Sequence, residues 1–410
     1  METIPGMIVT QHAGGGKANQ YFLRGFNLDH GTDFATDFNG VPINLPTHAH
    51  GEGYTDLNFL IPELIQRLDY AKGPYYAQYG DFASAGAANI QYFERLPQNI
   101  ALTTVGQYGY YRGLLAMSHT LVENDFYGYN GPDRVLPPVN PGTILGAIEA
   151  LHNDGPWNPP ENFRKLNFRL GYSQGSDEDG FGLAVTGYSG AWTGEQQIAE
   201  RAIRHHVVDY FGNLDPCDGG DSQRYIFSAE WQGRLTDNSY TRAILFTYYY
   251  DLDLFSNFTY FLDNPILGDQ FEQKDQRIVS GLTIDHKIFS QWFGRDAIND
   301  LGLQIRNDYI MNVALNHTHQ RNLYAELSDD RVIETSVSPY FANRVQWTKW
   351  FRTVAGVRGD LFTASVTDKL GGPNGGTATS FLASPKPQMI FGPWHNTSST
   401  RYPQRGSSAD

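Results

Sequence analysis

The chain has 410 residues, with 30 Lys or Arg and 44 Asp or Glu, which gives a formal net charge of -14 at pH 7. This sign of charge disfavours a partner bound through its phosphates, so we expect no nucleic acid. The 14% aromatic content and the 43 glycines favour strands and turns over a helical bundle, and the single cysteine, Cys217, excludes an internal disulfide. No apolar stretch approaches the roughly 20 residues of a membrane-spanning helix.

The chain divides into three parts. Residues 1–96 mix short apolar runs with Gly and Pro and predict a compact α+β domain, in which Pro62 is placed to start a helix over 62–68. The run GGGK at 14–17 lacks the first glycine and the hydroxyl of a phosphate loop and predicts a flexible loop. Residues 97–397 repeat a rhythm of strands and loops, and residues 398–410 lose it, which predicts an irregular tail.

The rhythm is an alternation of apolar and polar residues in about ten segments. Leu166, Phe168 and Leu170 would share one face of a strand, with Asn167 and Arg169 on the other. Residues 225–235, 301–309 and 351–361 repeat the pattern. We therefore expect an antiparallel sheet with one apolar and one charged face.

Alternation of this kind fits a soluble sandwich as well as a membrane barrel. A nearly continuous strand over 238–255 is long for a sandwich. Long connections near 125–161, 193–222 and 255–272, together with aromatic residues at strand ends such as Trp347 and Trp350, suit a transmembrane antiparallel β-barrel. These features favour the barrel.

Several runs in the first 90 residues resemble the plug domain of TonB-dependent outer-membrane receptors, and two later runs resemble barrel strand positions of that family. The plug runs are LRGF at 23–26, NGVPIN at 39–44, HGEGYTDL at 50–57, IPELIQR at 61–67, KGP at 72–74, QYG at 78–80 and AGAAN at 85–89; the barrel runs are VRGD at 357–360 and SPK at 384–386.

The resemblance implies a mainly β protein, with an N-terminal α+β plug domain (1–96) followed by a partial transmembrane antiparallel β-barrel (97–397). The export signal, the TonB-contacting box and the first plug strand of the family should precede Met1. Family barrels have about 22 strands, against the ten or so segments seen here. We therefore expect a receptor truncated at both ends.

By resemblance, the protein is an outer-membrane receptor of a Gram-negative-type bacterium that takes up a scarce solute, most readily a ferric siderophore or another metal complex. Its partners would be the TonB complex, outer-membrane lipid and the small-molecule or metal-chelate ligand. No cofactor and no enzymatic activity are implied. Two alternatives stay open: a soluble β-rich carbohydrate-binding or hydrolytic protein, and a non-functional receptor fragment.

Two cations of the plug domain, Arg24 and Lys72, are predicted to lock it to carboxylates of the barrel, a role that the resemblance supports. Glycines are predicted where the domain needs tight turns or positive φ. These are Gly25, Gly40, Gly51, Gly53, Gly73, Gly80 and Gly86.

Ligand contacts are predicted at His48, His50 and Tyr54, because the plug apex is where ligands of this family meet the plug. Two imidazoles two residues apart can share a face and a metal, but without a third ligand in the sequence they also read as solvated loop residues, and no firm metal site is predicted. The run GYSQG around Ser173 matches a hydrolase pattern, yet it ends a strand and precedes an acidic turn, so no catalytic residue is expected.

Overall fold

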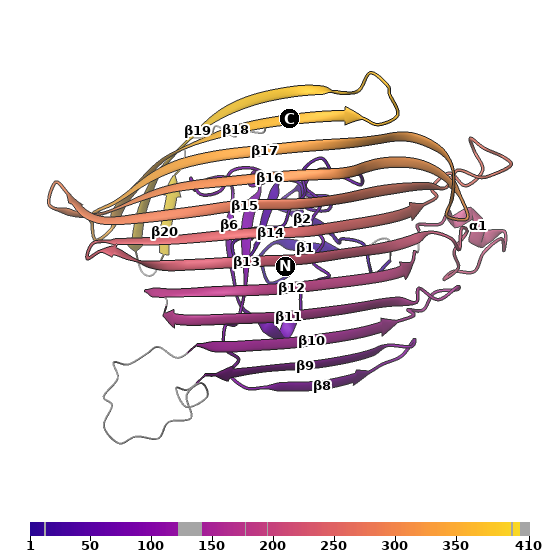
Figure 1. Cartoon of the computed structure of the whole chain (residues 1–410), viewed down its shortest axis with the longest axis horizontal. Helices are drawn as coiled ribbons and strands as arrows, with labels where there is room; N and C mark the ends of the chain where they lie inside the picture. Colours follow the sequence, from indigo (N-terminus) through magenta and orange to yellow (C-terminus); the bar gives the residue numbers. More distant parts are fainter. Residues whose placement is uncertain (12–13, 122–141, 177, 195, 395–396, 402–410) are drawn as a thin grey trace.

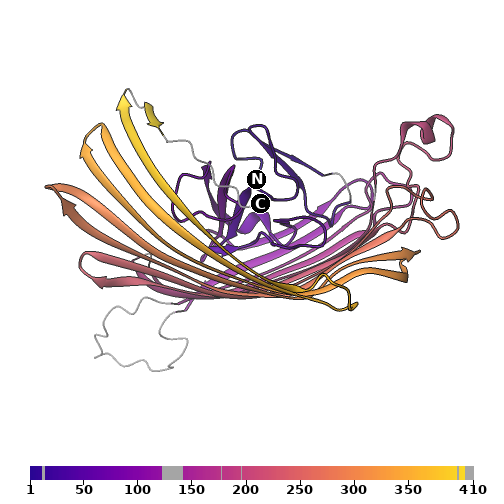
Figure 2. The ribbon, with the colours of Figure 1, turned by 90° about the horizontal axis from the view of Figure 1, so that it is seen from above.

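A computed structural model describes residues 1–11, 14–121, 142–176, 178–194, 196–394 and 397–401, with no side-chain description from residue 394 onward. Strands dominate it. One large curved sheet, which we call the wall, partly surrounds a small N-terminal domain that lies on its concave side (Figures 1 and 2). The helices of the described residues are short, and none is long and apolar enough to cross a membrane.

Over the residues that the structure describes, the wall has 13 strands, each antiparallel to the next along the chain, in the order β20 to β8. The expectation of a mainly β, antiparallel sheet is confirmed, and the expected number of about ten strands was too low. The strands are β8 (Ile100–Val105), β9 (Tyr111–Thr120), β10 (Thr143–Asn153), β11 (Phe163–Ser176), β12 (Asp179–Thr193), β13 (Gly219–Thr236), β14 (Ser239–Ser256), β15 (Phe271–Trp292), β16 (Arg295–His319), β17 (Asn322–Thr348), β18 (Phe351–Asp368), β19 (Gly376–Trp394) and β20 (Thr397–Arg401).

Alternating side chains give the wall its two faces. On β11, Leu166 and Leu170 are about half exposed on the outer face, whereas Asn167 between them is completely buried on the concave face. The long strand expected over 238–255 is present as β14. The apolar residues predicted to share one face therefore do so, and the polar residues face the N-terminal domain.

Connections between strands fall at two ends of the wall. The loop end carries the connections 106–110, 154–162, 194–218, 257–270, 320–321 and 369–375, including the short helix α1 (Glu200–Arg204). The turn end carries tight turns at 237–238, 293–294 and 349–350. Residues 122–141, which include the first part of the predicted loop 125–161, lie outside the described residues. The predicted loop 125–161 is thus wrong over 143–153, where apolar residues at alternate positions pair as β10 with β9 and β11.

The N-terminal domain contains two small sheets. One has the order β1 (Met7–Thr10), β2 (Gln20–Leu23), β3 (Phe26–Asn27). The other has the order β5 (Val41–Pro42), β4 (Phe34–Phe38), β7 (Gly86–Tyr92), β6 (Ile65–Lys72), with β4 and β7 parallel. Apolar clusters join this domain to the wall. In the larger one, Phe38 and Ile43 pack with Tyr248 and Leu252, and in a smaller one Ala77 packs with Tyr340 and Ala342.

The helix predicted over 62–68 is wrong. Only one turn of 3-10 helix, η1 (Pro62–Leu64), follows Ile61, and the backbone is extended from Ile65, where β6 begins. Residues 65–72 pair antiparallel with β7. The pairing in this sheet outweighs the local preference of the sequence, as tertiary contacts commonly do for short segments.

The predicted domain boundaries can be set beside the strands. β7 ends at Tyr92 and β8 begins at Ile100, so the boundary at 96/97 falls in a connection and stays a prediction. The irregular tail expected from 398 is wrong for 398–401, which continue β20 and pair with β19. Strand pairing uses backbone groups and needs no alternation of side chains. Residues 402–410 lie outside the described residues.

The loop predicted to be flexible at 14–17 is packed against the wall. A Cβ on Gly16 would lie 1.9 Å from Cε3 of Trp192, and the Gly15 N–H donates to the Glu161 carboxylate. Trp192 itself is buried. Gly16 is therefore required by this close approach to an immobile ring.

We expect Gly16→Ala to lower the unfolding free energy by about 1–3 kcal/mol, because the added methyl group overlaps the Trp192 ring. The matched control is Gly146→Ala on β10, where a Cβ meets no atom within 4 Å. Calorimetry of both variants checks this, and equal stability would contradict the packing.

Candidate functional site

The candidate site is the polar interface between the N-terminal domain and the concave face of the wall. Alternation along the strands points one set of polar side chains inward, including four cations from four strands. Arg277 lies on β15, Arg306 on β16, Arg358 on β18 and Lys386 on β19. Arg277 is fully buried, so its charge needs close partners.

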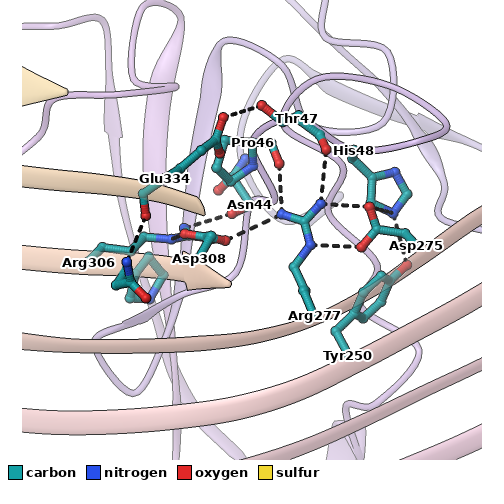
Figure 3. A network of polar contacts seen from close by, with 12 residues as sticks. Asn44, Pro46, Thr47, His48, Tyr250, Asp275, Arg277, Arg306, Asp308 and Glu334 are labelled. Atoms are coloured by element: carbon teal, nitrogen blue, oxygen red, sulfur yellow. Dashed lines mark hydrogen bonds and ion pairs between the residues drawn. The ribbon is translucent and has the colours of Figure 1, made fainter. Parts of the chain in front are cut away.

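The guanidinium of Arg277 joins wall and domain (Figure 3). It donates to the backbone carbonyls of Pro46 at 2.7 Å and Thr47 at 3.1 Å. It also donates to both carboxylate oxygens of Asp275, at 2.7 and 2.6 Å, and more weakly to Asp308 at 3.3 Å. Wall carboxylates thus balance the charge while the remaining N–H groups hold the domain backbone.

Arg306 repeats this arrangement on the neighbouring strand. It donates to the Asn44 carbonyl at 2.8 Å and to the two oxygens of Asp308 at 2.6 and 2.8 Å. On β17, the Glu334 carboxylate accepts a hydrogen bond from the Thr47 hydroxyl. Residues 44–47 are therefore held from three adjacent strands (Figure 3).

A second segment of the domain is held in the same way. Arg358 donates to the Gln78 carbonyl at 3.3 Å and pairs with Asp360 at 2.7 Å. Lys386 donates to the carbonyls of Pro74 at 2.8 Å and Tyr79 at 3.1 Å. We call the contacts of Arg277, Arg306, Arg358 and Lys386 with 44–47 and 74–80 the latch.

One domain carboxylate also pairs with a wall cation. Both oxygens of Glu63 accept from Arg112 on β9, at 2.6 and 2.7 Å, and Arg112 also donates to Glu149 at 2.5 Å. The hydrogen bonds from Arg112 lower the pKa of the Glu63 carboxyl. This bidentate pair has the locking geometry expected of Arg24 and Lys72, with the charges reversed.

The structure does not bring Arg24 or Lys72 to a wall carboxylate within the described residues. Arg24 is exposed in the turn between β2 and β3, with φ of 50°. Lys72 donates to the Pro5 carbonyl at 2.6 Å, inside its own domain. Their locking role stays a prediction, and the latch cations come from the wall.

The predicted glycines lie at turns and close approaches. Gly80 is one latch position, because a Cβ there would lie 2.3 Å from Nε of Arg358. Gly40 has φ of 79° and faces Ile244 of the wall at 2.5 Å. Positive φ is also found at Gly25, Gly53, Gly73 and Gly86, and Gly51 approaches only Asp29.

The predicted ligand residues His48 and Tyr54 are buried beside the latch. Their rings stack with centroids 4.3 Å apart, and His48 Nε2 lies 3.3 Å from the Tyr250 hydroxyl and 4.0 Å from Asp275. Burial and the nearby Arg277 charge hold the pKa of His48 well below its usual value, so this imidazole is neutral.

His50 lies nearer the loop end and is half-buried. Its Nδ1 is 2.7 Å from Oε1 of Gln273, two residues into β15. The ring of His30, a residue the sequence did not single out, lies 4.8 Å away between centroids. No sequence signal joins two histidines 20 residues apart. Among the described residues, no three His, Cys, Asp or Glu side chains form a group that could hold a metal ion. The ligand role of His48, His50 and Tyr54 stays a prediction.

A cavity of about 640 Å³ lies beside the latch, between the N-terminal domain and β14–β19, and Asn44, Gly80 and Arg358 are among the residues that line it. Asp37 of the domain faces it together with Arg242, Asp285 and Arg344 of the wall. Burial raises the pKa of the Asp37 carboxyl to about 6, against the opposing effect of Arg306 and Arg242. Ser173 of the run GYSQG lies within β11, which pairs with β12 as a hairpin, and not at a strand-to-helix turn. This is the context that the sequence predicted for it.

Comparison with known proteins finds similarity at two levels, in the sequence of the N-terminal domain and in the fold of the chain. A family model described as the TonB-dependent Receptor Plug Domain matches residues 1–87. The fold resembles the unliganded ferric citrate transporter FecA with a TM-score of 0.73 and 12% identity, over 94% of this chain and 56% of that one. It also resembles the copper transporter OprC, with a TM-score of 0.67 and 14% identity over 96% of this chain and 59% of that one. The ferric yersiniabactin uptake receptor FyuA from Yersinia pestis matches with a TM-score of 0.63 and 14% identity over 94% of this chain and 57% of that one. The chain spans a little over half the length of these structures.

We expect Arg277→Met to weaken docking of the N-terminal domain by about 3–5 kcal/mol, because it leaves the buried Asp275 without its partner. Chemical unfolding, with hydrogen exchange of the amides of residues 44–50, measures the loss. The double variant Arg277→Met with Asp275→Leu should lose less, since no unpaired charge is then buried.

The control for this variant is Arg204→Met, which removes an exposed pair with Glu200 and should change stability by less than about 0.5 kcal/mol. Equal effects of the two single variants would contradict the latch.

Asp37→Asn should raise stability at pH 7 by about 1–3 kcal/mol. The ordinary pKa of 3.8 is raised to about 6 in the folded state, so the folded protein binds this proton more tightly and loses stability as the pH rises from 4 to 6. Calorimetry between pH 4 and 7 should show a smaller decline in the variant. Asp69→Asn, at a half-exposed side chain paired with Arg67, is the control; an unchanged pH dependence in Asp37→Asn would refute the assignment.

Proposed function

We propose that this chain, whose residues 1–87 match the TonB-dependent receptor plug domain, forms the plug domain and part of the barrel of an outer-membrane receptor. The receptor would take up a scarce solute, a ferric siderophore or another metal complex, with energy delivered by the TonB complex. The latch is the observation that carries this function: buried wall cations hold a small domain inside the curved sheet through hydrogen bonds to its backbone.

The faces of the wall support placement in an outer membrane. Large apolar side chains cover the convex face, and an exposed apolar surface of this extent is costly in water but matched by lipid. This argues against the alternative of a soluble carbohydrate-binding or hydrolytic protein. Examples spread over the wall are Leu115, Leu170, Leu183, Leu245, Phe289, Leu301 and Phe381, each more than 40% exposed.

The loop end would face the cell exterior and the turn end the periplasm, as in barrels whose long loops lie outside. His48 and His50 then lie on the side of the domain that approaches the loop end, since they contact Asp275 and Gln273 in the part of β15 next to the loop 257–270. Tyr54 stacks on His48 there. A solute entering between the loops would meet this side first. No bond is made or broken in such uptake.

The latch suits a plug that must move and return. Each hydrogen bond from a charged donor contributes about 1.5–3 kcal/mol, so the contacts at 44–47 and 74–80 are strong together but separable one after another under a pulling force. The outer membrane has no energy source of its own, so the work would come through TonB, by way of the contact box that the family places before the plug.

Fractionation and uptake test this function. The protein should remain in the outer-membrane fraction and show heat-modifiable migration. Cells that carry the complete gene should accumulate at least one of three labelled solutes, ferric citrate, ferric yersiniabactin or copper, and lose this accumulation when TonB is deleted. These probes are taken from the names of the three structural relatives. Accumulation that persists without TonB, or a fully soluble protein, would contradict the proposal.

A further inference from the structure

A groove of about 690 Å³ lies on the convex face of the wall, at the loop end of β8 to β12. These five strands lie side by side at one edge of the wall (Figure 1). Strand pairing aligns their outward side chains in rows. The row that lines the groove, which we call the Gly113 row, consists of Thr103, Gly113, Ala150, Leu166 and Ser189. The groove is present because most of these side chains are small.

Larger side chains border the Gly113 row on both sides. Towards the turn end, the next outward row contains Leu115 and Ile148, which are each about half exposed. Towards the loop end, the rings of Tyr111 and His152 stack with centroids 6.4 Å apart. A Cβ on Gly113 would meet no atom within 4 Å, so the space between these borders is open.

The groove lies at one boundary of the membrane-spanning band. β9 and β10 have 10 and 11 residues, which is the length of a tilted strand that crosses the hydrocarbon core. Tyr111 begins β9, and His152 is the last residue but one of β10. Tyrosine is enriched where hydrocarbon meets the lipid head groups. The Gly113 row therefore faces the hydrocarbon, just inside the level of the head groups.

Arg164 supplies a positive charge at this boundary. It follows alternation with Lys165, which points inward and lies 3.4 Å from Glu149. Arg164 itself is exposed on the outer face of β11, pairs in register with His152, and has no ion-pair partner within the described part of the chain. His152 faces the Asp154 carboxylate at 3.2 Å. Arg164 is therefore the cation that is available to a ligand in the groove.

We propose that this groove binds a phosphorylated lipid of the membrane leaflet at the loop end, with one acyl chain against the Gly113 row and a phosphate group on Arg164. A guanidinium group binds phosphate through paired N–H groups, and basic side chains at a membrane boundary attract anionic lipids. The apolar groove and the arginine match the two parts of such a molecule. This inference rests on the proposed placement in an outer membrane, and it assigns a lipid site on the barrel that is separate from the solute.

Native mass spectrometry of the purified protein in detergent, titrated with bisphosphorylated lipid A, tests the site. Arg164→Gln should weaken binding about fivefold, because it removes one cation at the head-group level. Gly113→Leu should weaken it at least about tenfold, since the leucine takes the place of several methylene groups of the acyl chain. Inorganic phosphate, which has no acyl chain, should not compete. Both variants change positions without packed neighbours and should keep the lipid-free unfolding temperature.

The matched controls lie outside the groove. Gly146→Leu adds a side chain at a position on β10 where a Cβ also meets no atom within 4 Å, and Arg234→Gln removes an exposed arginine that pairs with Glu178 at the turn end. Both should bind lipid A as the parent does.

Equal binding by the parent, Arg164→Gln and Gly113→Leu would overturn the site, as would competition by inorganic phosphate. A dimer of the parent that Gly113→Leu abolishes would also overturn it, in favour of contact between two copies of the chain. The titration needs neither solute nor TonB, so a failed lipid site leaves the uptake experiment untouched, and a fully soluble protein would already fail the fractionation test of the proposed function.

Discussion

A charge buried at an interface must be paired, and here the pairing is what attaches one domain to another. Arg277, Arg306 and Arg358 are each matched by an aspartate of the wall and have N–H groups left over for backbone carbonyls of the plug. The aspartates meet the cost of burying the cations, so the plug needs no counter-charge of its own at these contacts. At these three contacts the plug can therefore separate without leaving an unpaired charge, whereas the pair of Glu63 with Arg112 would be broken.

The two roles of loop 44–56 follow from this arrangement. Its first residues are held by the latch, and a few residues further on it carries His50, beside His30. His48 lies between them and contacts both Tyr54 and Asp275, the carboxylate partner of Arg277. In the proposed function, the segment that would meet the solute at His48 and His50 also carries contacts that hold the plug.

The sequence was informative where periodicity or a known motif carries the signal. Alternation placed Leu166 and Leu170 on the outer face, and the N-terminal runs identified the plug. The partners of the wall cations could not be predicted, because backbone carbonyls have no signature in a sequence. The locking role of Arg24 and Lys72 stays a prediction, and the cations that hold residues 44–47 of the plug come from the wall. His30 was missed because only the fold brings it to His50, and the helix at 62–68 was wrong because pairing with β7 decides that segment.

Cross-linking between Thr47 and β17 tests the central claim most directly, that the wall grips the plug backbone at 44–47. With Cys217→Ser as background, Thr47→Cys combined with Glu334→Cys should be joined by a short bifunctional thiol reagent in native membranes, because these side chains touch. Thr47→Cys combined with Ile333→Cys should not, since Ile333 is 40% exposed on the opposite face of the same strand. Equal cross-linking of both pairs, or none of the first, would contradict the account.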